Sequence, residues 1–167
     1  MPSGHDNQLT KQVGEYLVAA ELARRGLLSA TFNGNVPHYD VLAADRNGRR
    51  VLIQVKAIKR GNWQFNAGAY IDVAFEGSRQ VLGETKRCPV PGLMCVFVLV
   101  GGTGKDRFFI FPWEDLANLI SSKYRAYIDR KHGVRPRKPD SLHSKLGVED
   151  LVKYENRWEG LVANIGA

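Results

Sequence analysis

Cysteine is scarce in this sequence, and so are the other residues that usually build a metal or redox site. Only Cys88 and Cys95 occur among the 167 residues, and their spacing matches neither a zinc-binding nor a redox motif. The four histidines also lack the spacing of metal ligands. These absences exclude a zinc or dithiol site, and we expect reduced thiols in a cytoplasmic protein.

Long apolar runs are missing as well. The N-terminal residues, MPSGHDNQLTKQ, contain no apolar segment of the signal-peptide type, and the longest apolar run elsewhere is far too short to span a bilayer. We therefore expect a soluble protein with no membrane partner. A chain of this length, with 44% hydrophobic residues and no internal repeat, is expected to form one domain over residues 1–167.

Acidic residues are outnumbered, since 17 Asp and Glu face 24 Lys and Arg, and the net charge of +7 favours a polyanionic partner. Six of these seven net charges arise in residues 123–138, which contain a basic linker at about 133–140. This segment is either a phosphate-contact surface for DNA or a solvated helix face with a flexible tail. Tyr124, Tyr127 and Trp113 could stack on bases, although aromatic residues at helical spacing are more often core. The candidate DNA-binding residues are Lys123, Arg125, Arg130, Lys131, Arg135, Arg137 and Lys138.

Hydrophobic periodicity predicts an α/β fold. Apolar residues recur at helical spacing from Asn7 to Arg25, and Gly26 can end this helix. Three β-like runs follow, LLSATFN, YDVLAAD and RVLIQVKAI, and LMCVFVLVGGTGKDRFFIF reads as two further strands. A helix is expected to begin after Pro112, and a last one at about 148–163. This order indicates a mixed sheet with helices packed against it.

The connection DRNG between the second and third of these runs determines how they pair. A three-residue loop, residues 46–48, with Gly48 at positive φ would put Asp40 directly opposite Gln54. A two-residue turn at positions 47 and 48 would instead put Asp40 opposite Val55 and send its carboxylate to the other face. Both registers are compatible with the sequence.

The three-residue loop would create an unusual polar cluster in an otherwise apolar strand. Gln54 and Lys56 share one strand face, Asp40 would join them, and the same count puts His38 opposite Lys56. Glu15 lies on the side of the first helix that can pack on this sheet. An unpaired buried charge is costly, so such a cluster needs a function or a partner.

These residues resemble the motifs of the PD-(D/E)XK nuclease superfamily, which includes restriction endonucleases and Holliday-junction resolvases. The matching residues are Glu15 on the first helix, Asp40 at the end of PHYD, and Gln54 and Lys56 in IQVK. The resemblance implies an α/β, restriction-endonuclease-like core in which a central mixed β-sheet is flanked by helices. It also implies a Mg²⁺ or Mn²⁺ ion held by Asp40, Gln54, the Val55 carbonyl and Glu15, with Lys56 assisting the attacking water.

The resemblance implies a metal-dependent DNA endonuclease, and nuclease domains of this size often act as a homodimer to cut both strands. Two departures from the family pattern stand out. Pro37 lies three residues before Asp40 instead of next to it, and Gln54 replaces an acid with a neutral amide, which binds Mg²⁺ less strongly. The alternative is therefore a degenerate nuclease fold that only binds nucleic acid or protein.

Overall fold

The protein, described by a computed structural model over residues 4–32 and 37–166, folds into two compact units. Segments of the two units alternate along the chain, so that each unit is built from parts distant in sequence. The expected single domain over residues 1–167 stays a prediction. The first unit comprises Met1–Trp63, Pro89–Trp113 and Gly147–Ala167, and the second comprises Gln64–Cys88 and Glu114–Leu146.

The first unit is built on a five-stranded sheet with the strand order β1-β2-β3-β7-β8. β3 and β7 are parallel, whereas the other neighbours are antiparallel, so the sheet is mixed. Two helices pack on it, α1, Gly4–Arg24, and α4, Trp158–Ala163, which confirms the predicted α/β class with a central mixed sheet flanked by helices. The strands are β1 Leu28–Thr31, β2 Val41–Ala44, β3 Arg50–Ile58, β7 Met94–Leu99 and β8 Arg107–Pro112.

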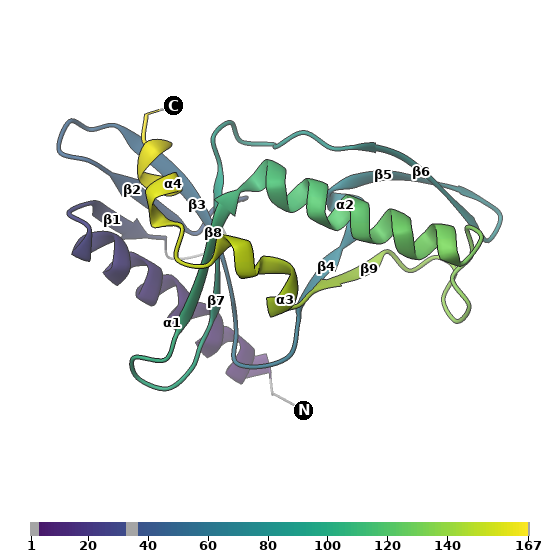
Figure 1. Cartoon of the computed structure of the whole chain (residues 1–167), viewed down its shortest axis with the longest axis horizontal. Helices are drawn as coiled ribbons and strands as arrows, with labels where there is room; N and C mark the ends of the chain where they lie inside the picture. Colours follow the sequence, from purple (N-terminus) through teal and green to yellow (C-terminus); the bar gives the residue numbers. More distant parts are fainter. Residues whose placement is uncertain (1–3, 33–36, 167) are drawn as a thin grey trace. The chain divides into compact units, whose positions relative to one another are not determined.

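Helix α1, Gly4–Arg24, lies along β1, β2 and β3 and makes its main contacts with β3 (Figure 1). The helix is correctly predicted, but the apolar residues Leu9, Val13 and Tyr16 that contribute to its periodicity are 40–54% exposed. The residues of α1 that pack on the sheet form a neighbouring row at i, i+4 spacing, which begins one residue after Leu9. It consists of Thr10, Gly14, Val18 and Leu22.

Gly14 explains why this stripe packs on the sheet. A Cβ atom at Gly14 would lie 2.4 Å from the Cβ of Ala57 and 3.6 Å from Cγ1 of Val55. Real Cβ atoms do not approach each other as closely as 2.4 Å, so α1 comes nearer to β3 here than any residue other than glycine allows. Glu15 is the next residue of α1, so this close contact also holds Glu15 near the sheet.

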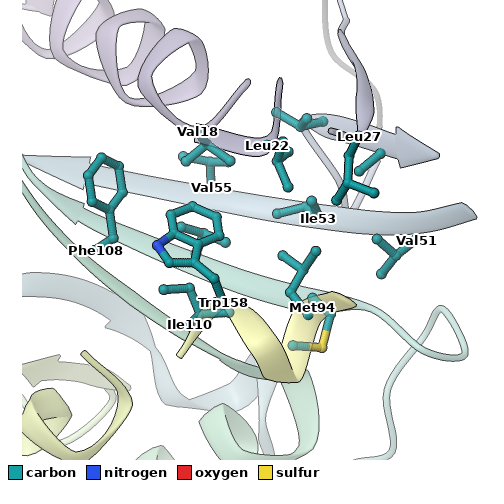
Figure 2. Close-up of a cluster of buried hydrophobic side chains, with 14 of the residues drawn as sticks. Val18, Leu22, Leu27, Val51, Ile53, Val55, Met94, Phe108, Ile110 and Trp158 are labelled. Carbon is teal, nitrogen blue, oxygen red and sulfur yellow. The ribbon is translucent and has the colours of Figure 1, made fainter. Parts of the chain in front are cut away.

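One hydrophobic core fills the space between α1, α4 and the sheet (Figure 2). Alternate residues of β3 point into it, and the parallel register aligns them with alternate residues of β7. The residues between them, Gln54 and Lys56 included, belong to the opposite face of the sheet. Trp63 packs on that opposite face, against Phe97 and Phe109. The core includes Val18, Leu22, Val51, Ile53, Val55, Met94, Val96, Phe108, Ile110, Trp158 and Leu161.

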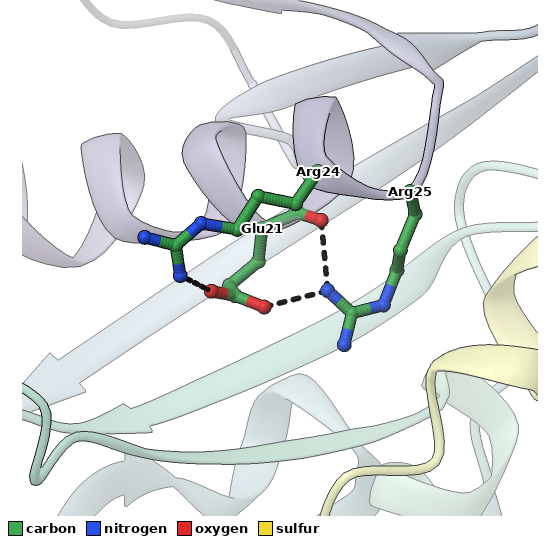
Figure 3. A network of polar contacts seen from close by, with 3 residues as sticks. All are labelled: Glu21, Arg24 and Arg25. Atoms are coloured by element: carbon green, nitrogen blue, oxygen red, sulfur yellow. Dashed lines mark hydrogen bonds and ion pairs between the residues drawn. The ribbon is translucent and has the colours of Figure 1, made fainter.

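The C-terminal end of α1 is fixed by polar contacts and by a left-handed glycine. Glu21 accepts hydrogen bonds from Nη1 of Arg24 and Nη1 of Arg25, and Arg25 also donates to the Glu21 carbonyl at 2.8 Å (Figure 3). Gly26 has a φ of +78°, and the Leu27 N–H donates back to the Leu22 carbonyl at 3.1 Å. This is the helix end that Gly26 predicts.

The predicted helix at about 148–163 is wrong as a single element. The segment forms α3, Val148–Leu151, the 3₁₀ turn η2, Val152–Tyr154, and α4, Trp158–Ala163. Asn156 breaks the helix with a φ of +55°, and its N–H donates to the Phe108 carbonyl at 2.9 Å. This hydrogen bond to β8 fixes the backbone at the point where the hydrophobic periodicity of the sequence predicts a continuous helix.

The second unit contains most of α2, Trp113–Arg130, and two pairs of strands, of which β5 and β6 are antiparallel. Tyr124 of α2 is buried, and its hydroxyl donates to Oε1 of Gln80 at 2.7 Å, so this aromatic residue belongs to the core. No helix within the described parts of the chain is long and apolar enough to cross a membrane. The paired strands are β5 Ile71–Glu76 with β6 Arg79–Thr85, and β4 Trp63–Asn66 with β9 His143–Leu146; η1, Ala67–Ala69, follows β4.

Candidate active site

The turn between β2 and β3 sets the register of the candidate site. Gly48 has a φ of +77°, and its N–H donates to the Asp45 carbonyl at 3.1 Å. The Asp45 N–H donates to the Arg49 carbonyl at 2.9 Å, which closes a loop of three residues. The pairing of β2 with β3 has the register that this loop requires. The three-residue loop is therefore confirmed, and the two-residue alternative is excluded.

Asp40 lies just before β2, where the regular ladder ends. Its N–H donates to the Ile53 carbonyl at 2.8 Å, and its Oδ2 accepts a hydrogen bond from the N–H of Val55 at 2.9 Å. The carboxylate is thus fixed against the backbone of β3. The predicted position of His38 opposite Lys56 is wrong, because the ladder does not continue beyond β2 and His38 is exposed with a φ of +74°.

Gln54 and Lys56 lie two residues apart on β3 and share the face of the sheet that turns away from α1. Both side chains are partly buried. The Oε1 atom of Gln54 is buried and accepts no hydrogen bond from any described residue. Leaving a buried polar atom without a partner costs about 1–3 kcal/mol. This oxygen therefore has a binding capacity that a cation or a donor would satisfy.

Lys56 is held in a largely apolar environment. Phe97 is its neighbour on β7, and the indole Nε1 of Trp63 donates to the Lys56 carbonyl at 3.0 Å. Burial lowers the pKa of the Lys56 ammonium below its ordinary value, although the negative charge of Asp40 acts in the opposite direction. A lysine of this kind releases its proton more readily than a surface lysine.

Glu15 of α1 meets Asp40 through Lys11, which lies one helical turn before Glu15. The Nζ atom of Lys11 is 3.5 Å from Oε1 of Glu15 and 3.3 Å from Oδ1 of Asp40. The side chain of Glu15 is only 12% exposed, whereas that of Lys11 is 55% exposed. Two carboxylates from different elements therefore share one ammonium group.

The charges at this contact shift each other's ionisation. Burial and the nearby charge of Asp40 raise the pKa of Glu15, against the opposing effect of Lys11. Burial works to lower the pKa of Lys11, but the charges and hydrogen bonds of Asp40 and Glu15 outweigh it, so that its pKa is raised. The ammonium of Lys11 consequently stays protonated between the two acids.

The donor set is compatible with a hard divalent cation. Mg²⁺ prefers oxygen ligands from carboxylates, amides and backbone carbonyls. The described residues contain no group of three His, Cys, Asp or Glu side chains that could hold a metal ion. A cation bound to Asp40 and Glu15 would therefore need a further oxygen ligand. Gln54 in that role stays a prediction, because its side chain belongs to the face of the sheet that turns away from α1. The Val55 side chain is buried in the core, and its carbonyl as a ligand stays a prediction.

A cavity of about 340 Å³ opens beside the two carboxylates. Its walls come from α1, from the end of β1 and from the residues before β2, and they include both Glu15 and Asp40. Phe32 and Tyr39 line it and contact each other edge to face, with ring centroids 5.3 Å apart. The carboxylate pair is therefore accessible from solvent.

The predicted DNA-contact residues all lie in the second unit, on α2 and in the segment after it. Arg135 is partly buried, with its guanidinium 5.0 Å from the centre of the Tyr127 ring, and it donates to the His143 carbonyl at 2.9 Å. Arg125 donates to the Gly83 carbonyl at 2.7 Å, so both arginines have structural contacts. The exposed members of the set are Lys123, Arg125, Arg130, Lys131, Arg137 and Lys138.

Lys11 is the residue of this cluster that the sequence alone did not identify. Its spacing of four residues before Glu15 was a usable signal, because Lys and Glu at i, i+4 contact each other on a helix. Such pairs are usually solvent-exposed and of little consequence. What distinguishes this one is the third partner, Asp40, which the docking of α1 brings to it.

The fold and the site define an α/β protein in which a helix and a hairpin bring two carboxylates, an amide and two lysines to one region of a mixed sheet. No protein-family model matches the sequence. No match is found among curated proteins. Among solved structures, the chain is similar to a bacterial homing endonuclease, I-Ssp6803I, with a TM-score of 0.48, 15% sequence identity and coverage of 93% of each chain.

Proposed function

We propose that the protein is a divalent-metal-dependent DNA endonuclease of the PD-(D/E)XK type. The observation that carries this proposal is the buried Oε1 of Gln54, which accepts no hydrogen bond from a described residue and belongs to the strand whose backbone binds Asp40. An amide oxygen in that condition is costly to a purely structural protein. It is useful to a protein that binds a cation.

Asp40, Gln54 and Glu15 would hold the cation, Mg²⁺ or Mn²⁺, together with the backbone carbonyl of Val55. When bound, the ion would supply stabilisation of the phosphate charge and activation of a water molecule. The Val55 N–H already fixes one oxygen of Asp40, so that the carboxylate needs little reorganisation to bind. The cavity beside Glu15 and Asp40 would give the phosphate access to this cation.

Lys56 would act on the attacking water and on the scissile phosphate. Its position two residues from Gln54 puts both groups on the same face of β3. Because burial lowers the pKa of Lys56, its amine can accept a proton from water more readily than that of an exposed lysine. In its protonated form it would offset the negative charge of the phosphate.

The exposed basic residues of the second unit would bind the phosphate backbone of DNA without reading its sequence. Their affinity would depend strongly on salt, because each neutralised phosphate releases counterions. A homodimer would supply the second site that a double-strand cut requires. The DNA contact is proposed from the charge of these residues, and the homodimer from the small size of the chain.

Cleavage of supercoiled and linear DNA in the presence of Mg²⁺ or Mn²⁺ tests the proposal. Lys56→Met should reduce the cleavage rate by about 100-fold or more, which is the usual contribution of a general acid or base. Lys59→Met is the matched control, because Lys59 follows the same strand but is exposed, and it should cleave like the wild type. Equal rates for the wild type and Lys56→Met would overturn the assignment of Lys56.

A second function, nucleic-acid binding without catalysis, is favoured by one observation. The amide of Gln54 is neutral, and the described residues offer no group of three metal-binding side chains. This alternative predicts DNA retention that depends on salt and is independent of divalent cations. Calorimetry that detects Mn²⁺ binding to the wild type, and its loss in Asp40→Ala, would decide against it.

A further inference from the structure

Lys11 occupies the space between the two carboxylates of the candidate site. Its ammonium lies 3.5 Å from Oε1 of Glu15 and 3.3 Å from Oδ1 of Asp40. The other oxygen of Asp40 is already bound by the N–H of Val55. The ammonium therefore contacts the remaining oxygen of Asp40 and one oxygen of Glu15, which are oxygens that a metal ion would also use.

A positive charge is needed at this position when no metal is bound. Glu15 is largely buried, and its carboxylate and that of Asp40 both lie within 3.5 Å of the same ammonium, so that the two negative charges are close enough to repel each other. Two like charges within a few Å destabilise a fold unless a cation lies between them. Lys11 supplies one unit of positive charge, whereas a divalent cation would supply two.

We propose that Lys11 is a built-in counter-ion that occupies the cation site of the metal-free protein and is displaced when a divalent cation binds, so that it sets the metal affinity of the site. The identity of the competing cation rests on the proposed function. Lys11 is a positioning residue in this scheme, because it acts on the carboxylates and not on the substrate.

The surroundings of Lys11 allow this exchange without a change in the backbone. Its side chain is 55% exposed, although it is anchored at its charged end by both acids. It also lines the cavity of about 340 Å³, together with Gln8 and Gln12 of the same helix. The flexible side chain can therefore turn into this open space while α1 stays docked.

The role of Lys11 as a counter-ion can be tested in the metal-free protein. Urea unfolding in the presence of a chelator should show a lower midpoint for Lys11→Met, because the two carboxylates are then left without their shared cation. The same substitution should lower the midpoint less in a Glu15→Gln background, where one of the two charges is absent. Equal shifts in the two backgrounds would overturn the proposal.

Calorimetric titration with Mn²⁺ tests the competition itself. Lys11→Met should bind Mn²⁺ at least about fivefold more tightly than the wild type, since one opposing unit charge at this distance is worth that factor even with full solvent screening. Lys145→Met removes the same charge from an exposed strand position of the second unit and should leave the affinity unchanged.

The outcomes separate this proposal from the proposed function. If the wild type and Lys11→Met bind Mn²⁺ with the same affinity, or if the variant binds more weakly, Lys11 does not compete and this inference fails while the cation site stands. If neither protein binds Mn²⁺, the cation site fails, and the proposed function fails with it.

Discussion

Gly14→Ala is the substitution whose effect follows most directly from the structure. The added Cβ would lie 2.4 Å from the Cβ of Ala57, whereas ordinary contacts between such atoms are 3.4–4 Å. Both atoms belong to regular elements, α1 and β3, so that neither can turn away as the end of a long side chain would. The helix and the strand must move apart by about 1 Å.

Two opposing effects determine the change in the free energy of unfolding. Alanine favours the helical conformation over glycine by about 1 kcal/mol. Overpacking of a close contact costs about 1–3 kcal/mol. Gly160→Ala provides the matched control, because Gly160 lies in α4 and its added Cβ would meet no atom within 4 Å. The two variants should therefore differ by about 1–3 kcal/mol, with Gly14→Ala the less stable.

Urea unfolding monitored by circular dichroism measures this difference. Ala57→Gly removes the atom that the new Cβ meets, so it should recover stability when combined with Gly14→Ala, beyond the sum of the two single effects. The displaced helix also carries Glu15 away from Asp40, which should weaken Mn²⁺ binding. Equal stability of Gly14→Ala and Gly160→Ala would refute the close packing of α1 on β3.

Three further predictions concern charge. Gln54→Glu should tighten Mn²⁺ binding in calorimetry and lower the metal-free urea midpoint, because it adds a carboxylate near Asp40; an unchanged affinity would remove Gln54 from the cation site. Hydrogen bonds from Arg25 and Arg24 lower the pKa of Glu21 below 4.5, so the wild type should exceed Glu21→Gln in stability by up to about 1 kcal/mol above pH 4.5. Urea unfolding should show this advantage disappearing as the pH falls through the lowered pKa, and a constant difference would contradict it. Changing exposed basic residues after α2 to Gln should reduce the salt dependence of DNA retention by about one unit of slope for each phosphate that is no longer neutralised, and an unaltered slope would place the DNA surface elsewhere.

The parts of the fold that were predictable from sequence are those determined by local chemistry. Gly48 can take positive φ at low cost, so that a tight turn between β2 and β3 was predictable, together with the two registers that such a turn allows. Gly26 likewise marked the end of α1. Each of these features depends on a few neighbouring residues, so that a short stretch of sequence predicts the turn and the helix end, whereas the choice between the two registers required the structure.

The parts that were not predictable from sequence depend on distant partners. β4 pairs with β9, about 80 residues later, and no local pattern announces that pairing. The helix expected at about 148–163 is interrupted where Asn156 binds the backbone of β8. The regular pairing of β2 with β3 ends before Asp40, whose carboxylate accepts a hydrogen bond from the N–H of Val55. Counting residue pairs beyond this point, which predicted His38 opposite Lys56, therefore fails. In each case a tertiary contact overrides a periodic pattern.

The division of the site between α1 and the β2–β3 hairpin has a consequence for how the protein matures. The hairpin can form early, because its turn and its pairing are local. Glu15 and Lys11 join Asp40 only when the helix docks through Gly14, which requires the folded sheet. A newly synthesised chain therefore lacks the paired carboxylates until packing is complete. The proposed cation site would therefore exist only after α1 has docked on the sheet.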